Sequence, residues 1–219
     1  MTQRDISLED TKKQARKVLR QLEKDYPDVE CALNYDTPFQ LLIATILSAQ
    51  CTDARVNIVT KELFGSYPTA AEIAVLPVAK LEKIVHSTGF FRNKAKNIKA
   101  ASQALADNHD GQVPQDLNIL IKLPGVGRKT ANVVLGTAFG IASGVVVDTH
   151  VGRLSRRLGL TVNKDAVKVE RDLIEILPKK DWVRFSHQMI HHGRDVCDSR
   201  KPNCEACNFR KFCPQAGVK

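Results

Sequence analysis

The segment from Leu123 to Thr130 contains a turn that could bind an anion, and a lysine that could act as a nucleophile. Gly125 and Gly127 stand one residue apart. Because glycine has no Cβ, each can adopt positive φ, and the turn can expose consecutive backbone N–H groups. A helix is expected to begin directly after this turn, with the positive end of its dipole facing the same point. Together these groups would bind a phosphate through Gly125, Val126, Gly127, Arg128 and Thr130.

Two other interpretations of this turn compete with an anion site. The phosphate-binding loop of nucleotide hydrolases needs glycine directly before its Lys-Ser/Thr pair, and a strand before the loop. Arg128 occupies that glycine position and the preceding segment has helical spacing, so such a loop is excluded. An ordinary corner between two helices stays open as an interpretation.

The charge around the turn favours an anionic partner. The whole chain has 33 Lys and Arg against 24 Asp and Glu, a formal net charge of +9. Between Ile121 and Leu160, however, six basic residues meet a single acid, Asp148. A solvated face usually mixes both signs, so this stretch is predicted to form a local positive field. Its basic residues are Lys122, Arg128, Lys129, Arg153, Arg156 and Arg157.

Lys129 and Asp148 are the residues of this stretch that could carry out a reaction. A neutral lysine amine can attack a sugar carbon and form a Schiff base. Burial, Arg128 and the helix N-terminus would favour the neutral amine, whereas a nearby Asp148 would favour the ammonium. Asp148 could stabilise positive charge that develops on a sugar. The simpler roles are phosphate contact for Lys129 and an N-cap for Asp148, which precedes an amphipathic basic helix.

Four of the six cysteines fall within 17 residues, with the spacing Cys-x6-Cys-x2-Cys-x5-Cys. In a cytosolic protein such crowding indicates a metal centre rather than disulfides. An all-thiolate ligand set suits either zinc or an iron–sulfur cluster, and the spacing leaves both open. The loop could be a structural staple or could also face the partner. His187 and His191 lack the glutamate of a zinc-hydrolase motif and are predicted to pack or to form hydrogen bonds.

Composition is that of a globular protein, with 43% apolar and 26% charged residues. The longest apolar stretch, Phe39–Ala49, is too short to span a bilayer, and the N-terminal sequence has no secretory apolar core. We therefore expect a cytoplasmic monomer with no membrane partner. Aromatic residues make up only 5%, which argues against a stacking platform for single strands.

Helical periodicity dominates the chain, so the sequence predicts an all-α fold. The first helix is expected to end near Tyr26-Pro27, and Pro38 opens an almost wholly apolar helix that should be buried. Thr52 or Asp53 can cap the next helix, which runs to about Phe64. Further helices are predicted at 69–75, 78–87, 92–108, about 117–121, 128–138, 149–158, 164–177 and 180–192. Only Val145–Val147 suggests a strand.

Three segments in this order resemble the endonuclease III family: LPGVGRKTA, VVVDTH and the cysteine motif. SAQCTD at 48–53 and NKAKNI at 93–98 are also similar to family segments, so the resemblance covers about residues 20–213. It implies a two-domain helix–hairpin–helix DNA glycosylase fold. A helical barrel domain would occupy 31–141 with the hairpin at about 117–138. Residues 1–30 and 142–219 would form a second domain with a [4Fe-4S] cluster loop at 197–213.

The resemblance also assigns residues to roles. Lys129 would be the nucleophile and Asp148 the catalytic carboxylate. Gln50 would fill the space left by a flipped base, and Phe90 stands where many members carry a leucine wedge. DNA contacts are further assigned to His150, which could instead be structural, and to Lys201 in the cluster loop. The cluster ligands would be Cys197, Cys204, Cys207 and Cys213.

The implied activity is base excision repair in the bacterial nucleoid, on double-stranded DNA that contains damaged pyrimidines or abasic sites. Lys129 would attack the anomeric carbon and displace an oxidised pyrimidine such as thymine glycol, and β-elimination would cut the strand on the 3′ side. One alternative is a monofunctional glycosylase of the same superfamily, which lacks a lysine at this position. Others are a non-catalytic DNA-binding module with a metal staple, and a redox-sensing iron–sulfur protein, for which the glycine turn would have no purpose.

Overall fold

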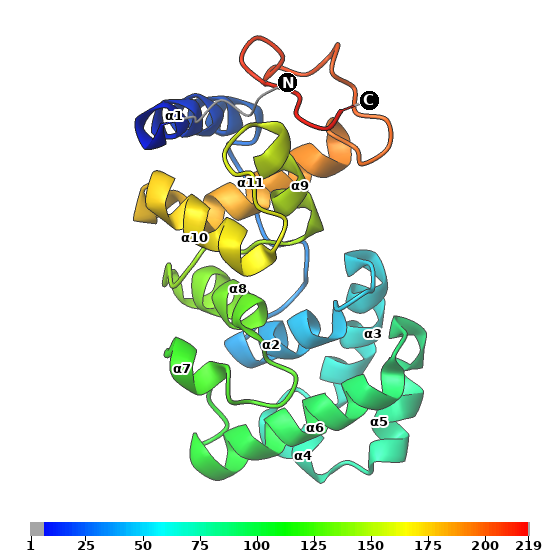
Figure 1. Cartoon of the computed structure of the whole chain (residues 1–219). Coiled ribbons are helices and arrows are strands. Elements are labelled where there is room, and N and C mark those ends of the chain that lie inside the picture. Colours follow the sequence, from blue (N-terminus) through cyan, green and yellow to red (C-terminus); the bar gives the residue numbers. More distant parts are fainter. Residues whose placement is uncertain (1–6, 219) are drawn as a thin grey trace. The chain divides into compact units, whose positions relative to one another are not determined.

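The computed structural model describes residues 7–218, in which all regular elements are helical (Figure 1), so the predicted all-α class is confirmed. Val145–Val147 form no strand. None of the helices in residues 7–218 has both the length and the apolar character needed to cross a bilayer. The elements are α1 Leu8–Asp25, α2 Pro38–Leu47, α3 Asp53–Ser66, α4 Ala70–Val75, α5 Val78–Val85, the 3-10 helix η1 His86–Thr88, α6 Phe91–Asn108, α7 Leu117–Leu120, α8 Arg128–Phe139, α9 Thr149–Arg157, α10 Ala166–Ile176, η2 Lys179–Asp181 and α11 Trp182–Asp195.

The chain divides into two compact units, each with its own hydrophobic core. The first part of the chain, up to Glu30, joins the segment from Gly144 onward in one unit. Cys31–Ser143 form the other and carry α2 to α8. The predicted reactive residues are therefore divided between units, because Lys129 precedes Ser143 and Asp148 follows Gly144.

Helix α2 is the centre of the unit Cys31–Ser143. The hydroxyl of Thr37 accepts a hydrogen bond from the backbone N–H of Gln40, and Pro38 occupies the first turn. Every residue from Phe39 to Leu47 is buried, as expected for a helix that is apolar nearly all round. It packs against α3, α6 and α8 (Figure 1), so the helix that carries Lys129 rests directly on the core.

Helices α7 and α8 form a hairpin around the glycine turn. Asp116 caps α7, and Leu120 and Leu123 bury their side chains below the turn. The turn closes through a hydrogen bond of 3.1 Å from the Val126 N–H to the Leu123 carbonyl oxygen. Helix α8 then begins with Gly127 as its N-cap and no side chain accepting from its first N–H groups. A helix N-terminus of this kind is a position where an external anion can bind.

Gly125 is held by two constraints at once. Its φ is +76°, and a Cβ added to it would lie 2.8 Å from the Cβ of Asn97 in α6. Gly127 differs on both counts, since its φ is −88° and a Cβ there would meet no atom within 4 Å. The backbone of the turn can therefore approach α6 only because residue 125 has no side chain.

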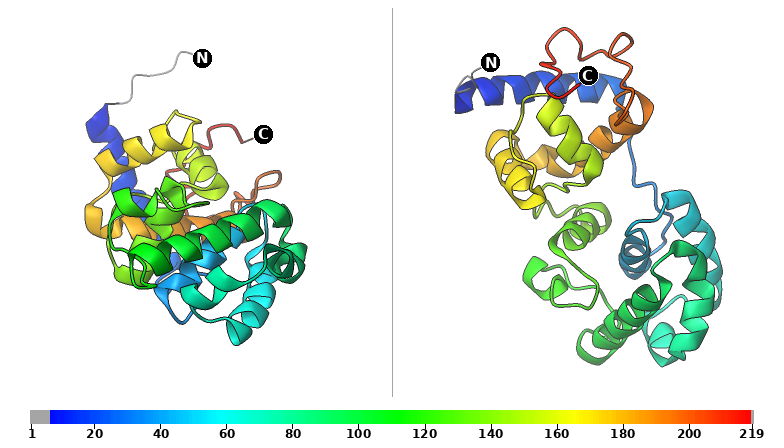
Figure 2. Two further views of the ribbon diagram at one scale, coloured as in Figure 1. Left: turned by 90° about the horizontal axis from the view of Figure 1, so that it is seen from below. Right: turned by 45° about the vertical axis from the view of Figure 1, so that its right-hand side comes forward.

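In the other unit α11 packs against α9 and α1, while α10 contacts α1 and α9, and Figure 2 shows α1 running beside α11. Phe185 and Met189 are fully buried on the core face of α11. Next to them, the hydroxyl of Ser186 accepts a hydrogen bond of 3.1 Å from the Val146 N–H. This bond anchors the extended segment that leads to Asp148.

Several predicted helix bounds differ from the structure, and three of the differences have a local reason. The helix expected at 78–87 stops at Val85 and continues as η1, because the Thr88 hydroxyl bonds back to the Val85 carbonyl oxygen at 2.8 Å. Asp165 caps α10, so this helix begins at Ala166 rather than at 164. Helix α11 runs to Asp195, past the predicted end at 192, because packing continues to Gly193.

The contrast between the two glycines predicts a difference in stability. Gly125→Ala should lower the free energy of unfolding by at least about 1–2 kcal/mol, the usual cost of the left-handed conformation, because the new methyl group also overlaps Asn97. Gly127→Ala should change it by no more than a few tenths of a kcal/mol. Chemical denaturation of both variants measures this difference. Equal stability of the two would contradict the proposed constraint.

Candidate functional site

Lys129 lies in the first turn of α8, and its side chain is exposed. The buried face of this helix is taken by Ala131, Val134 and Leu135. The described residues of the protein therefore do not bury the amine by themselves. The reason is geometric, because the first residues of α8 project beyond the core on which the rest of the helix packs.

The hairpin residues predicted to bind phosphate divide into two groups. Gly125, Gly127 and Arg128 are exposed and Thr130 is half-buried. The Val126 side chain, in contrast, is buried in the core. Val126 can therefore contact an anion only through its backbone, while its side chain anchors the turn.

Asp148 is the N-cap of α9. Its Oδ1 accepts a hydrogen bond of 2.8 Å from the Val151 N–H, and the side chain is half-buried. The Ser186 bond to Val146 holds the backbone just before Asp148, and the cap holds the Asp148 side chain. Asp148 therefore does act as an N-cap, the simpler of the two roles considered for it. Its second carboxylate oxygen remains for a substrate.

Gln50 and Phe90 share an unusual backbone conformation. Among residues 7–218 only four non-glycine residues have positive φ, and these two have values of 53° and 48°. Both side chains are exposed, Phe90 to 64%. Left-handed conformations of such residues persist where the surrounding structure enforces them, and they concentrate at functional sites.

The four clustered cysteines are half-buried and line one small cavity, together with the apolar side chains of Phe209 and Leu154. Burial raises the pKa values of the Cys207 and Cys213 thiols, so thiolates here need a positive partner. In residues 7–218, no three His, Cys, Asp or Glu side chains gather closely enough to hold a single metal ion. Four thiols around one cavity are a donor set that suits zinc or an iron–sulfur cluster.

Arg157 and Arg153 of α9 hold the start of the cysteine loop, which the sequence did not indicate. Arg157 is buried and donates to the Cys197 Sγ at 3.2 Å, the Asp198 carbonyl at 2.7 Å and the Ser199 carbonyl at 2.9 Å. Arg153 donates to the Cys197 carbonyl oxygen at 3.0 Å, and burial lowers its pKa, with a further contribution from Arg157. Both arginines, which the sequence places in the basic stretch, thus direct donors to the cysteine loop.

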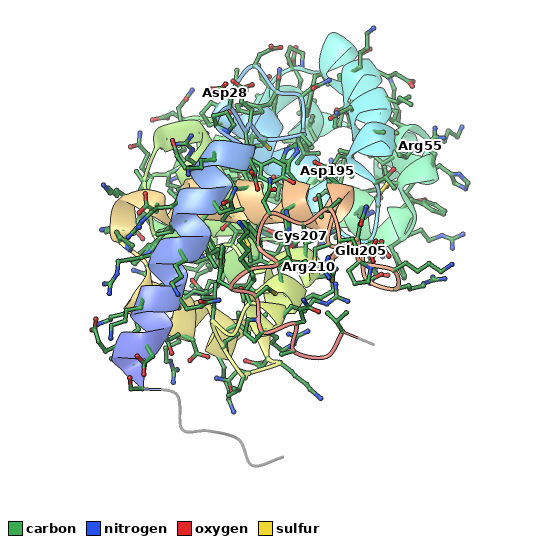
Figure 3. The ribbon with its side chains drawn as sticks, turned by 90° about the horizontal axis from the view of Figure 1, so that it is seen from above. Asp28, Arg55, Asp195, Glu205, Cys207 and Arg210 are labelled. Atoms are coloured by element: carbon green, nitrogen blue, oxygen red, sulfur yellow. The ribbon has the colours of Figure 1, made fainter. Side chains whose placement is uncertain are left out.

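His192 is a second residue of this region whose role was missed. It is 2% exposed, with Nδ1 3.3 Å from the Tyr26 hydroxyl and Nε2 3.6 Å from the Cys207 Sγ. Burial lowers its pKa to about 4, so the ring is neutral at physiological pH. Figure 3 shows Cys207 on the loop beside α11, near the helix end that carries Asp195. The only sequence signal was position, five residues before Cys197.

The remaining predicted contacts lie on the surface of this unit or just below it. His150 is half-buried, and its Nδ1 lies 3.2 Å from an Arg153 nitrogen. Lys201 is exposed, while its backbone N–H donates to the Asp198 carboxylate at 3.2 Å. Hydrogen bonds from the Arg200 and Lys201 N–H groups lower the pKa of Asp198. The loop that presents the Lys201 side chain is thus closed by its own backbone.

Comparison with known proteins agrees with this geometry. Residues 43–179 match the family model of the HhH-GPD superfamily base excision DNA repair proteins. The endonuclease III of Synechocystis sp. is 55% identical over 205 residues, covering 94% of each chain. The chain belongs to the endonuclease III family. The protein is therefore a base excision repair enzyme with DNA glycosylase and AP lyase function.

Solved structures of endonuclease III extend this result to three dimensions. A non-covalent complex of endonuclease III with DNA has 46% identity and a TM-score of 0.89, covering 93% of this chain and 95% of that one. A trapped covalent intermediate with DNA, described as an estranged-adenine complex, has 45% identity and the same TM-score, covering 93% and 96%. The predicted helix–hairpin–helix fold of the family is confirmed.

The cap geometry of Asp148 predicts how its variants fold. Asparagine caps helices about as well as aspartate, so Asp148→Asn should leave the free energy of unfolding nearly unchanged. Asp148→Ala removes the acceptor of the Val151 N–H and should cost about 1 kcal/mol. Thermal or chemical denaturation measures both. An Asp148→Ala variant as stable as the unsubstituted protein would show that the cap contributes nothing.

Proposed function

We propose that this enzyme removes oxidised pyrimidines of the thymine glycol type from duplex DNA and cleaves abasic sites through a Schiff base on Lys129. The observation that carries this proposal is an exposed lysine in the first turn of α8, directly after the glycine hairpin. The covalent DNA intermediate trapped in a relative that is 45% identical supports a covalent route. A monofunctional glycosylase would need no lysine at this position.

Lys129 would react in two stages. Its neutral amine attacks the anomeric carbon, the bond from that carbon to the base breaks, and the base leaves with the bonding electrons and gains a proton. The nitrogen then loses a proton, the bond from the anomeric carbon to the ring oxygen breaks and that oxygen gains a proton, which leaves a protonated Schiff base between Lys129 and the opened sugar. The Schiff base acidifies the neighbouring sugar carbon, and loss of its proton expels the 3′ phosphate with the electrons of the carbon–oxygen bond. Because Lys129 is exposed in the free protein, bound DNA would have to exclude water from around the amine.

Asp148 would stabilise the positive charge that develops on the sugar as the base leaves. The hydrogen bond to Val151 uses Oδ1 and holds the side chain in one orientation. A carboxylate that is already oriented needs no reorganisation when the charge appears. The N-cap and the catalytic role therefore support each other.

The proposed DNA contacts use both units, which we identify with the barrel domain and the cluster domain of the family. The backbone of the Gly125–Thr130 hairpin would bind a phosphate, with Lys201 and His150 making further contacts. Gln50 and Phe90 would enter the base stack around the extruded nucleotide. We propose a monomer that acts in the bacterial nucleoid, since the contacts named here come from one chain.

We propose that Cys197, Cys204, Cys207 and Cys213 bind a [4Fe-4S] cluster. Their thiols line one cavity, and an all-thiolate set of four ligands suits such a cluster, which the endonuclease III family generally carries. When bound, the cluster would cross-link a segment that has no helix of its own after Asp195. Arg157 and His192 would stabilise thiolate charge through the contacts to Cys197 and Cys207.

The Schiff base predicts a covalent adduct. Borohydride should trap the protein on duplexes that contain thymine glycol or an abasic site, and Lys129→Ala should abolish the adduct. Asp148→Asn should still fold but excise thymine glycol on the order of 100-fold more slowly or worse. Lys164→Ala, an exposed lysine of the other unit, is the matched control. Excision without trapping would favour a monofunctional glycosylase, and binding without either would favour a DNA-binding module.

The cluster predicts a metal content and a link to stability. The purified protein should be brown and contain about four iron atoms per chain. Cys207→Ser should lose most of this iron and lower the free energy of unfolding, because a bound centre stabilises the folded loop. Cys31→Ser, which alters a half-buried cysteine of the other unit, should keep the iron. Stoichiometric zinc in place of iron would refute the assignment.

A further inference from the structure

Lys94 is a buried lysine in α6 that the proposed reaction does not use. Its side chain belongs to a residue only 4% exposed, and its Nζ donates a hydrogen bond of 2.7 Å to the Thr88 carbonyl oxygen. A buried ammonium is costly, so it persists where it satisfies a specific acceptor. Two residues further along the helix, Lys96 is exposed. Lys94 therefore has a contact that its neighbour lacks.

The acceptor of this hydrogen bond lies at the start of a strained turn. Gly89 has φ 70° and ψ 156°, a region open almost only to glycine, and Phe90 follows with φ 48° and ψ 28°. The Lys94 backbone N–H donates to the Phe90 carbonyl oxygen at 3.1 Å. Lys94 therefore bonds to the turn at two points. Its side chain bonds to Thr88, before Gly89, and its backbone bonds to Phe90, after Gly89.

The same ammonium also lies close to the segment that carries Gln50. Burial lowers the pKa of Lys94, and the charge of the Cys51 thiol acts against this shift, so the two side chains are within electrostatic reach. Cys51 directly follows Gln50, the other exposed residue with positive φ in this unit that is proposed to enter the base stack. Lys94 therefore bonds to the segment before Phe90 and lies within electrostatic reach of the segment that carries Gln50.

We propose that Lys94 is a positioning residue, which holds the Thr88–Phe90 turn in its strained conformation so that Phe90 is presented to the base stack. This inference rests on the proposed function of Phe90. Its physical basis is preorganisation, because a side chain that is already oriented loses less conformational entropy when it inserts into DNA. Without the Lys94 ammonium, the Thr88 carbonyl loses its donor and the turn can relax.

The expected effect is selective. Excision of a paired lesion requires the base to be unstacked and extruded, whereas an abasic site has no base to unpair. Lys94→Met should therefore slow excision of thymine glycol on the order of 10- to 100-fold, the cost of a misplaced contact, and change abasic-site cleavage much less. Fluorescence of 2-aminopurine placed opposite the lesion should show reduced base displacement. Lys96→Met is the matched control and should change neither activity.

A double-mutant cycle with Phe90→Ala separates positioning from general damage. If Lys94 acts through Phe90, the Lys94→Met/Phe90→Ala variant should excise no more slowly than Phe90→Ala alone. Additive losses, or equal losses of excision and abasic-site cleavage in Lys94→Met, would overturn the inference. Borohydride trapping of the unsubstituted protein tests the proposed function separately.

A surface variant keeps the inference testable if Lys94→Met does not fold. Gly89→Ala places a methyl group where no atom lies within 4 Å, so it disturbs only the backbone of the turn. It should reproduce the selective loss of excision and of the 2-aminopurine signal. A Gly89→Ala variant with unchanged excision would show that the conformation of the turn does not matter, and the role of Lys94 would fall with it.

Discussion

The approach of Gly125 to Asn97 is the contact on which the position of Lys129 depends. It allows the turn to fold onto α6, which sets where α8 begins and leaves its first N–H groups without a side-chain cap. Lys129 lies in the first turn of α8 and its side chain is exposed, so it does not lie in a pocket of the described structure. The protein thus supplies position and an oriented dipole, and the substrate must supply the dry environment in which an amine can attack.

Each proposed functional side chain is exposed or half-buried, while a neighbouring group that holds it is buried. Ser186 anchors the segment before Asp148, Lys94 bonds to the turn before Phe90, and Arg157 binds the first cysteine of the loop. Such buried polar groups are stable only where carbonyl or sulfur acceptors satisfy them. Part of the positive charge of this DNA repair enzyme is therefore structural, although in the sequence it cannot be told apart from charge that faces DNA.

The cysteine loop, which has no helix among its described residues, is likewise held by buried side chains of other elements. Arg157 donates to successive carbonyl oxygens from Asp198 to Ser199, and His192 lies between Tyr26 and Cys207. These contacts come from α9 and α11, so the loop is shaped by helices distant in sequence.

The sequence by itself determined the helical class, the glycine hairpin before Lys129, the N-cap position of Asp148 and the grouping of four cysteines. These follow from local spacing: turn chemistry, capping and ligand intervals act over a few residues. Only the tertiary structure decided that Val126 is buried, that Arg153 and Arg157 point to the cysteine loop, and that Lys94 and Asn97 hold two different turns. The segment NKAKNI resembles the family in sequence, but its contacts depend on which face of α6 meets the core. That choice is made by long-range packing, which no local pattern records.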